Sequence, residues 1–411
     1  MKATIKNDAR RIIERAIAAV QPDEAVRRAL QDRAFPGRVL LVAAGKAAWQ
    51  MALAAHRCLG ERIQAGVVVT KYDHVKGPIA NYRCFEGGHP VPDENSFRGT
   101  QAALELVQGL CAKDTVIFLL SGGGSALFEK PLISGEELQD ITNQLLASGA
   151  DIVEINTIRK RLSAVKGGRF AQLCAPAHVC SVVLSDILGD PLDMIASGPA
   201  WPDASTCDEA RAIAEKYSLR LSDAVWALLE QETPKRLDNV EARITGSVRE
   251  LCTAAAQVCR ELGYEPTVLT DHLCCEAREA GSFLASIARS HAGRGKKLAF
   301  LAGGETVVPL TGKGKGGRNQ ELALAAAEGI AGLEDVLVFS IGSDGTDGPT
   351  DAAGGMVGGA TRDALADKGM KIHQVLADND AYHALQAVEG LIITGPTGTN
   401  VNDVSVVLIG Q

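Results

Sequence analysis

Glycine-rich segments that directly follow apolar runs are the parts of this sequence best suited to chemistry. The clearest is LLSGGGSALF, which contains Ser121, Gly122, Gly123, Gly124 and Ser125. Consecutive glycines let backbone N–H groups converge on an anion, and the N-terminus of a following helix would add its dipole. The segment therefore predicts a loop that binds phosphate, with a tight turn that binds nothing as the alternative.

A lysine after another apolar run is the second candidate. Lys46 in VAAGKAAWQM stands at the expected turn from a strand into a helix over 46–59, where the positive end of the helix dipole disfavours an ammonium. A bound anion would remove this misfit, and a solvated lysine without a role is the alternative. The segment is not a Walker A loop, because Ala47 stands where Ser or Thr is required.

The segment TGKGKGGRNQE is the third candidate. Its glycines satisfy GxGxxG over 312–317, which is the pattern of a dinucleotide-binding turn. The fingerprint expects an acid at the end of the next strand, about 20 residues later, but that predicted strand ends at Asp344, 27 residues after Gly317. Lys313, Lys315 and Arg318 suit a multiply charged phosphate group better than a pyrophosphate held by backbone alone. A flexible surface loop is the alternative.

Two acid-rich turns also follow apolar runs. Carboxylates at strand ends suit Mg²⁺, which usually takes one or two of them together with water and phosphate oxygens. Asp-Gly turns also form for purely local reasons, so either turn could be structural. The first turn supplies the candidate metal ligands Asp186, Asp190 and Asp193, and the second supplies Asp344, Asp347 and Asp351.

One histidine has a setting that would suit proton transfer. His89 in EGGHPVPDE is flanked by glycines and prolines, and it is either a general acid or base or a structural residue of a rigid loop. The sequence has no GxSxG, HExxH or kinase-type HRD motif.

The elements that must position these residues alternate along the chain. Apolar runs followed by Gly or Asp turns predict buried parallel strands, and helical periodicity lies between them over 46–59, 94–110 and 135–149. The polar segment 230–239 predicts a domain boundary. The last two strands are joined by a short linker, so we expect an antiparallel pair and a mixed second sheet. The predicted strands are 38–44, 65–70, 114–120 and 178–186, then 266–270, 297–305, 335–344, 391–396 and 403–410.

The composition excludes several classes of protein. The 411 residues suit two or three domains, and 46% apolar with 22% charged residues is typical of a folded globular chain. A net charge of −8 with 4% aromatic residues argues against nucleic-acid binding. No apolar run approaches the length of a membrane span, and the charged N-terminus lacks the apolar core of a secretory signal. We expect a cytoplasmic enzyme acting on small molecules.

Taken together, the motifs resemble one family over nearly the whole chain. They resemble the glycerate 2-kinases, the class II glycerate kinases whose C-terminal part is called the MOFRL domain. The segments that carry the resemblance are VAAGKAAWQM, GGHPVPDE, SGGGSALF, NTIRKRLSAVKGGRFA, LSDILGDPLDMIASGP, AGGETVV, GKGGRNQELAL, SIGSDGTDGPTDAAGG and TGPTGTNVNDVSVVLIG.

The resemblance implies a fold and an activity. The expected fold is a Rossmann-like parallel α/β/α domain over 1–235 and a smaller mixed-sheet α/β domain over 236–411, with the active site in the interdomain cleft. The expected reaction transfers the γ-phosphoryl group of ATP, with Mg²⁺, to the 2-hydroxyl of D-glycerate. The expected partners are these small molecules, without nucleic acid or membrane, and a monomer and a homodimer both stay open.

The resemblance also implies roles for single residues. Lys46 and Arg318 match the catalytic lysine and arginine proposed for the family. Residues 121–125, with Lys313 and Lys315, are then candidates to bind the ATP phosphates. The candidates for the glycerate site are Asn156, Arg159, Lys166 and Glu305.

Two other functions remain open at this point. Some relatives carry the label hydroxypyruvate reductase, so an NAD(P)H-dependent reductase could use the GxGxxG segment and His89 as proton donor. A non-catalytic protein that binds anions on the same scaffold is the second alternative.

Overall fold

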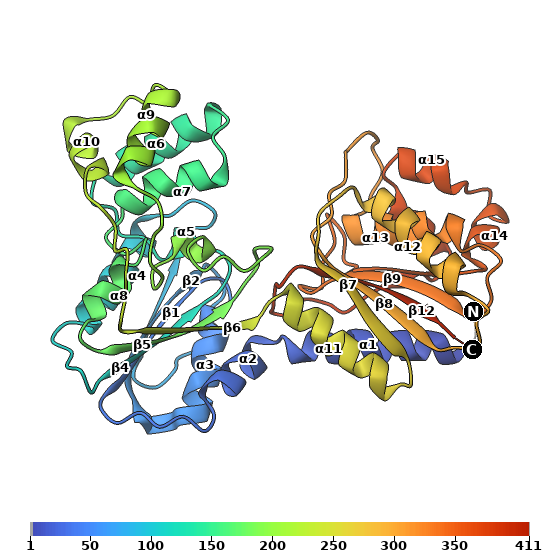
Figure 1. The fold of residues 1–411 in the computed structure, drawn as a ribbon, viewed down its shortest axis with the longest axis horizontal. Coiled ribbons are helices and arrows are strands. Elements are labelled where there is room, and N and C mark those ends of the chain that lie inside the picture. The colour runs from blue at the N-terminus through green and yellow to red at the C-terminus, as the bar shows by residue number, and fades with distance from the viewer. Residues whose placement is uncertain (1–2, 411) are drawn as a thin grey trace. The chain divides into compact units, whose positions relative to one another are not determined.

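The computed structural model describes residues 3–410 and divides them into two units (Figure 1). The first unit comprises residues 22–185 and 190–245, and the second comprises residues 3–21, 186–189 and 246–410. Within the described residues, no helix combines the length and the apolar character needed to cross a membrane.

The first unit is built on a six-stranded sheet, and all its pairings from β3 to β5 are parallel. This spatial order is that of a Rossmann fold, as predicted. Strands β1 and β4 are buried over their whole length, because helices cover both faces of such a sheet. In spatial order the strands are β3 (Tyr82–Gly87), β2 (Ile63–Lys71), β1 (Val39–Ala44), β4 (Thr115–Leu120), β5 (His178–Leu184) and β6 (Val240–Gly246).

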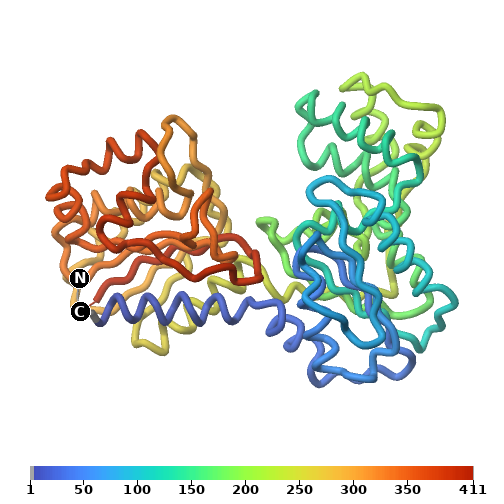
Figure 2. The backbone as a smooth tube through the Cα atoms, turned by 180° about the vertical axis from the view of Figure 1, so that it is seen from behind, coloured from blue at the N-terminus to red at the C-terminus, as the bar shows by residue number. Residues whose placement is uncertain are grey.

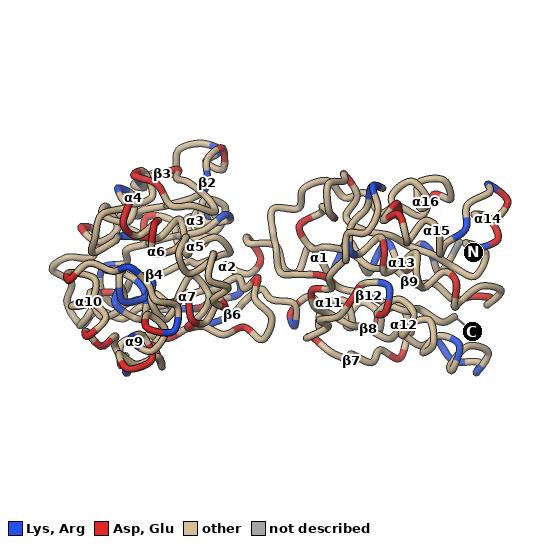
Figure 3. Tube along the Cα trace, turned by 90° about the horizontal axis from the view of Figure 1, so that it is seen from above, with Lys and Arg blue, Asp and Glu red and all other residues tan. Residues whose placement is uncertain are grey.

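Helices of the first unit include a separate group with its own apolar core. Leu138, Ile158, Ala210 and Val225 from α6, α7, α9 and α10 pack together in that core. These four helices lie beyond one end of the sheet in Figure 1. Lys and Arg residues gather at the end of α7 (Figure 3). The helices are α2 (Pro22–Leu30), α3 (Ala48–Leu59), α4 (Glu94–Leu106), α5 (Gly124–Leu127), α6 (Gly135–Ala147), α7 (Ile152–Arg161), α8 (Arg169–Cys174), α9 (Cys207–Lys216) and α10 (Asp223–Leu229), with short 3₁₀ turns at Gly60–Arg62 and Ile195–Ser197.

The second unit is built on a mixed six-stranded sheet. Only β7 and β8 pair in parallel, and β12 is antiparallel to both of its neighbours, β8 and β9. In spatial order the strands are β11 (Leu391–Ile392), β10 (Gly354–Gly358), β9 (Val336–Gly342), β12 (Asp403–Ile409), β8 (Leu298–Gly304) and β7 (Glu265–Leu273). Its helices are α1 (Ala3–Ala19), α11 (Val248–Glu261), α12 (Ala277–His291), α13 (Arg318–Gly329), α14 (Thr361–Ala366), α15 (Ile372–Ala377) and α16 (Ala381–Ala387).

One detail of the predicted pairing is wrong. We expected the last two strands to form an antiparallel pair, but β11 pairs with β10 at the sheet edge, while β12 lies between β8 and β9. The linker 393–402 is long enough for the chain to pass β10 and β9 before it re-enters the sheet. The prediction of a mixed sheet is confirmed.

The unit boundaries differ from those predicted, 1–235 and 236–411. Helix α1 packs in the second unit, because Ile5, Ile12 and Ile13 share a core cluster with Leu251 of α11 and Phe339 of β9. Figure 2 shows α1 running beside the strands of that unit. Strand β6 belongs to the first sheet, so the chain passes into the second unit near residue 246, and the polar segment 230–239 lies inside the first unit.

Candidate active site

Lys46 and the SGGGS loop lie side by side at the ends of two neighbouring strands. The amide of Lys46, after β1, donates to the carbonyl of Gly122, after β4, at 2.9 Å. The amide of Ala47 donates to Ser121 Oγ at 3.0 Å. A Cβ atom at Gly45 would lie 2.3 Å from Ser121 Oγ, so only glycine permits this approach. The two segments meet where the strand order reverses, which is where open α/β sheets bind ligands.

The same place has unused donors for an anion. Within residues 3–410, the amides of Gly122 and Gly123 have no acceptor, and the ammonium of Lys46 has no carboxylate within 4.0 Å. Gly123 has φ +84°, a conformation that glycine adopts without strain. Helix α5 has only four residues, so the helix dipole that we expected to help has little length here. Backbone amides and the Lys46 charge therefore carry the anion affinity.

Two histidines border Lys46. His74 Nδ1 lies 2.8 Å from the carbonyl of Lys46, so that nitrogen must carry the proton and donate. His89 lies against the loop, since a Cβ atom at Gly123 would be 2.9 Å from His89 Cδ2. Burial lowers the pKa of His89, and the nearby Lys46 and Lys71 lower it further. A neutral His89 therefore adds no positive charge near the loop at neutral pH.

Lys166 lies in a buried ion pair rather than at a surface. Its Nζ is 2.5 Å from Glu129 Oε2 and 2.8 Å from the carbonyl of Ser125, and both Lys166 and Glu129 have no exposed surface. Burial lowers the pKa of Lys166 to about 8, against the opposing effect of Glu129. The prediction that Lys166 binds the glycerate carboxylate does not fit this burial. Lys166 instead holds the end of the SGGGS loop.

Arg159 lies beside this pair. Its Nη2 is 3.7 Å from Glu129 Oε2 and 3.4 Å from the carbonyl of Ser125. Its Nε is buried and has no hydrogen-bond partner among the described residues. Arg159 thus keeps a donor for a further acceptor, which Lys166 does not.

Asn156 is connected to the loop through Ser197. Ser197 Oγ donates to Asn156 Oδ1 at 2.9 Å, so Ser125 Oγ, 3.2 Å away, donates to Ser197. Ala196, Ser197 and Gly198 have φ of 51°, 61° and 64°. Two consecutive residues with side chains in this region cost about 1–2 kcal/mol each. Such strain is common where a turn must hold functional groups in one geometry.

The three predicted metal ligands are divided between the two units. Asp186 belongs to the second unit, while Asp190 and Asp193 belong to the first. Asp193 lies 3.6 Å from Lys160 Nζ, and Asp190 has a buried Oδ1 without a partner among the described residues. Within residues 3–410 no group of three or more His, Cys, Asp or Glu side chains is arranged to hold a metal ion. The chain crosses between units inside this segment, and the assignment of these residues to a metal stays a prediction.

Arg318 is the centre of a second cluster, in the second unit. It begins α13, and its guanidinium donates to both oxygens of Asp403, at 2.5 and 3.0 Å, and to Glu305 at 2.8 Å. Glu305 follows β8 and Asp403 begins the antiparallel β12, so both reach the same end of the sheet. Asn402 Nδ2 donates to Glu305 at 3.1 Å. The fork geometry fixes the guanidinium plane, which a lysine would not permit.

Asp403 is almost fully buried in this cluster. Burial raises the pKa of its carboxyl group to about 6, although the contact with Arg318 acts in the opposite direction. Asp347 is also buried, which raises its pKa, and it accepts from the amides of Asn319 and Gln320 at the start of α13. Asp347 therefore stabilises a helix start.

The other members of the second acid-rich turn have local partners. Asp351 accepts from the hydroxyl of Tyr382 at 2.7 Å, and Asp344 accepts from the amide of Thr346 at 3.0 Å. Since Asp347 accepts from the first amides of α13, all three acids of this turn have hydrogen-bond partners within the second unit.

The GxGxxG segment is not a dinucleotide-binding turn. It begins eight residues after β8 ends at Gly304, whereas the fingerprint starts directly after a strand. Its glycines permit close packing, since a Cβ atom at Gly312 or Gly314 would lie within 2.5 Å of the turn 378–380. Lys313 is exposed, and Lys315 Nζ lies 4.4 Å from the ring centre of Tyr382. Both amides of these lysines are held by Asp378 and Asp380.

Sequence reasoning missed four residues of these clusters. Glu129, Ser197, Asn402 and Asp403 were not candidates, although Asn402 and Asp403 stand in the motif TGTNVNDVSVVLIG. For Asn402 and Asp403 a signal exists: polar residues just before and at the first position of a fully buried strand must lie at a sheet end.

Comparisons with known proteins cover parts of both units. A family model described as a domain of unknown function, DUF4147, matches residues 8–230, and the MOFRL family model matches residues 298–403. A protein of Thermotoga maritima named D-glycerate 2-kinase is 53% identical over 99% of both chains. A solved structure titled glycerate kinase from the same organism has a TM-score of 0.94 at 52% identity, covering 98% of this chain and 99% of that one.

A more distant relative carries a different name. A protein of Agrobacterium vitis named putative hydroxypyruvate reductase is 40% identical over 91% of this chain and 100% of its own length. The higher identity to the Thermotoga maritima protein favours the kinase function over the reductase function. Because the similarity to D-glycerate 2-kinase extends over 99% of the chain and therefore over both units, the chain belongs to the glycerate 2-kinase family.

Proposed function

We propose that this protein transfers the γ-phosphoryl group of ATP to the 2-hydroxyl of D-glycerate, giving 2-phosphoglycerate and ADP. The observation that carries the proposal is the unneutralised Lys46 beside the free amides of Gly122 and Gly123. Phosphoryl transfer requires mainly positioning and charge neutralisation, and both are provided by fixed donors of this kind.

Positively charged residues and backbone amides would act on the transferring group. In this proposal residues 121–125 bind phosphate oxygens through backbone amides, and Lys46 neutralises the charge that develops on the γ-phosphoryl group. Arg318 would also neutralise charge on the γ-phosphoryl group, and Asp403 and Glu305 orient its guanidinium. Lys313 and Lys315 attract the phosphates of ATP.

The acceptor would be held by polar groups near the SGGGS loop. Asn156 Oδ1 accepts from Ser197. Its amide nitrogen has only a long contact to Met194 Sδ, at 3.9 Å, so it can also donate to a hydroxyl of the acceptor. Arg159 has an unused buried Nε and suits the carboxylate of glycerate. Glu305 is bonded to Arg318 and Asn402, so it would act by positioning rather than by contact with the acceptor.

Mg²⁺ fits this chain as an ion bound mainly by the nucleotide. Mg²⁺ in such sites takes one or two carboxylates, with water and phosphate oxygens as its other ligands, so a set of three protein ligands is not required. The partnerless, buried Oδ1 of Asp190 suits a single carboxylate ligand. When bound, the ion would neutralise charge on the phosphate oxygens.

The test is identification of the product. Phosphorus NMR of a reaction with ATP, Mg²⁺ and D-glycerate should show 2-phosphoglycerate, with one ADP formed per product molecule. The matched reaction replaces ATP and D-glycerate by NADH and hydroxypyruvate and should show no NADH oxidation. NADH oxidation in the matched reaction, with no ADP formed in the first reaction, would favour the reductase function instead. ATP binding without turnover would favour a non-catalytic role.

A further inference from the structure

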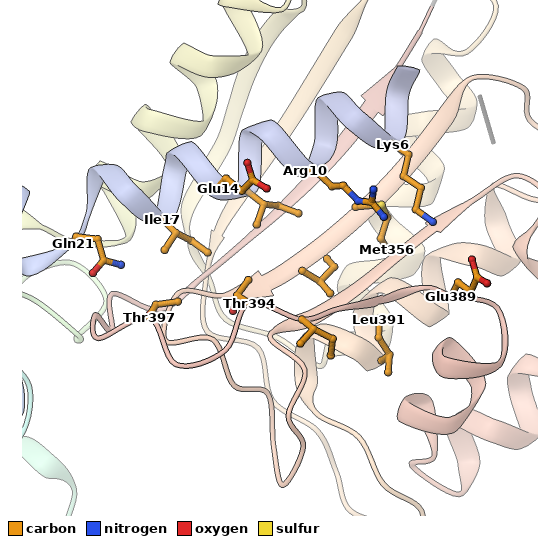
Figure 4. Close-up of a pocket in the computed structure, with 13 residues that line it drawn as sticks. Lys6, Arg10, Glu14, Ile17, Gln21, Met356, Glu389, Leu391, Thr394 and Thr397 are labelled. Carbon is orange, nitrogen blue, oxygen red and sulfur yellow. The ribbon is translucent and has the colours of Figure 1, made fainter. Parts of the chain in front are cut away.

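A cavity in the second unit is not used by the proposed reaction (Figure 4). Its volume is about 630 Å³, and its walls are α1, the strands β10 and β11, and the loop 393–397. Sites for small organic molecules usually measure about 300–1,000 Å³. The cavity therefore has the size of a ligand site.

The floor of the cavity is apolar. Ile13 and Ile17 of α1, Met356 of β10 and Ile392 of β11 are each at most 9% exposed, and all four belong to the core cluster that joins α1 to the sheet. Ile393 is 58% exposed at the wall. These surfaces suit the hydrocarbon part of a ligand.

One wall is held in place by hydrogen bonds. Thr397 Oγ1 donates to the carbonyl of Ser343 at 2.6 Å, and the amide of Thr397 donates to the carbonyl of Asp344 at 3.1 Å. Both bonds are made within the chain, so they fix the loop that forms this wall. A loop fixed in this way loses little conformational freedom on binding.

Two cations line one end of the cavity without a partner. Lys6 and Arg10 lie one turn apart on α1, and Figure 4 shows both side chains on the cavity side of the helix. Within residues 3–410 neither has a carboxylate within 4.0 Å, although Glu14 and Glu389 also line the cavity. The ion pairs of α1 instead involve Asp8 and Arg15.

The two cations repel each other, although Glu14, four residues after Arg10, acts in the opposite direction. Like charges four residues apart on a helix repel, and both lie in the first half of α1, whose first turn has no acidic residue. A single anionic group between Lys6 and Arg10 would relieve both effects and would be held by charge-assisted hydrogen bonds.

We propose that this cavity binds a small organic anion, a carboxylate or sulfonate on an apolar body. The anionic group lies between Lys6 and Arg10, and the apolar body packs on Ile13, Ile17 and Met356.

Two naphthalene dyes test both halves of the proposal. Anilinonaphthalene sulfonate carries an anionic group on an aromatic body, and phenyl-naphthylamine is its neutral counterpart. Fluorescence titration of the full chain should show saturable binding of one sulfonate dye per chain, roughly tenfold or more tighter than the neutral dye. Equal affinity of the two dyes would overturn the role of the cations.

Charge variants of α1 test whether the sulfonate dye binds in this cavity. Lys6→Glu with Arg10→Glu should weaken sulfonate binding roughly tenfold or more and leave the neutral dye unchanged. Arg10→Glu alone should also weaken sulfonate binding, whereas Arg11→Glu, the same single charge reversal at an exposed position of α1 that does not line the cavity, should leave both dyes unchanged. Lys6→Gln with Arg10→Gln is the milder pair if reversal of both charges disturbs folding.

Two outcomes would contradict the assignment. Equal weakening by Arg11→Glu would mean that the dye responds only to the net charge of α1. Displacement of the dye by ATP would place it at the nucleotide site. Retention of the dye at saturating ATP, together with its loss in the Lys6 and Arg10 variants, supports the cavity.

Discussion

The ammonium of Lys166 and the carboxylate of Glu129 form an ion pair at 2.5 Å, with neither side chain exposed to solvent. Lys166 also donates to the carbonyl of Ser125. A pair of this kind is costly to break, because the remaining buried charge has no water and has lost its closest partner. It therefore ties the stability of the first unit to the geometry of the SGGGS loop.

Removal of one member of this pair should destabilise the protein strongly. We expect Lys166→Met to lower the free energy of unfolding by about 3–5 kcal/mol, since the buried Glu129 keeps only the longer contact to Arg159. Lys166→Met combined with Glu129→Gln should recover most of that loss, because no buried charge remains. Denaturant titration of the three proteins measures this. A double variant as unstable as Lys166→Met would contradict the assignment of the cost to the unpaired charge.

The double variant also separates stability from activity. It should fold, yet its activity should stay low, because the Ser125 carbonyl has lost the Lys166 donor. Full activity in the stable double variant would show that the loop keeps its geometry without Lys166.

Lys46→Ala and Arg318→Ala should each lower kcat by roughly 10² to 10³, with a much smaller effect on ATP binding. A fixed donor aimed at developing charge contributes about 3–4 kcal/mol to the barrier when it is removed. Steady-state kinetics measures both parameters. Lys313→Ala is the control, and it should raise KM for ATP at unchanged kcat. A raised KM with an unchanged kcat in the Lys46 variant would assign Lys46 to ground-state binding instead.

Arg318→Lys separates charge from geometry. It keeps the positive charge but cannot reproduce the two bonds to Asp403 with the third to Glu305. We expect kcat close to that of Arg318→Ala. Near-normal kcat in Arg318→Lys would show that charge alone is sufficient.

Activity should fall as pH drops through about 6. Asp403 has a pKa of about 6, raised by burial, and its protonation removes an acceptor from Arg318. The groups that face it are Arg318, Asp347 and Asn319. A profile of kcat against pH should show this acid limb, and Asp403→Asn should lack it. Asp344→Asn, which alters an acid outside the Arg318 contacts, should keep it. A limb that persists in Asp403→Asn belongs to another group.

The same carboxyl group affects stability with a defined sign. Its pKa is higher in the folded state than in the unfolded chain, so between about pH 4 and 6 the folded state binds more protons. The contribution of Asp403 to the free energy of unfolding therefore falls as pH rises through this window.

Asp190→Asn should raise the Mg²⁺ concentration needed for half-maximal activity. Its Oδ1 is buried and without a partner, and a carboxylate binds Mg²⁺ more strongly than an amide oxygen. Mg²⁺ titration of activity after chelator treatment measures this. Asp193→Asn is the matched control, because that carboxylate lies near Lys160, and it should titrate like the parent. A shift in Asp193→Asn alone would reverse the assignment.

The parts of the fold that the sequence predicted are those with local signals. Strands β1 and β4 are uninterrupted apolar runs that end at glycine or serine, and parallel neighbours bring their ends together, so Lys46 and the SGGGS loop could be paired in advance. Strand β6, VEARITG, is only partly buried and has no apolar run, so it was missed. Strand β10, GGMVG, is mostly glycine and lacks strand propensity.

The residues that could not be predicted depend on contacts far apart in the sequence. The burial of Lys166 follows from its packing against Glu129, 37 residues earlier, and a basic run on a helix looks the same whether solvated or buried. Asp403 reaches Arg318 only because β12 enters the sheet between β8 and β9. Periodicity gives the type of an element but not its neighbours.

The place of α1 in the second unit has a consequence for biosynthesis. The ribosome makes residues 3–19 long before their packing partners in the core cluster, which begin with Val248 and continue to Leu408. At about 5–20 residues per second, the apolar face of α1 waits for tens of seconds without its core. A nascent chain stalled before residue 248 should therefore recruit a chaperone that recognises apolar helices. The first unit, whose residues 22–185 and 190–245 are complete by then, can fold during that interval.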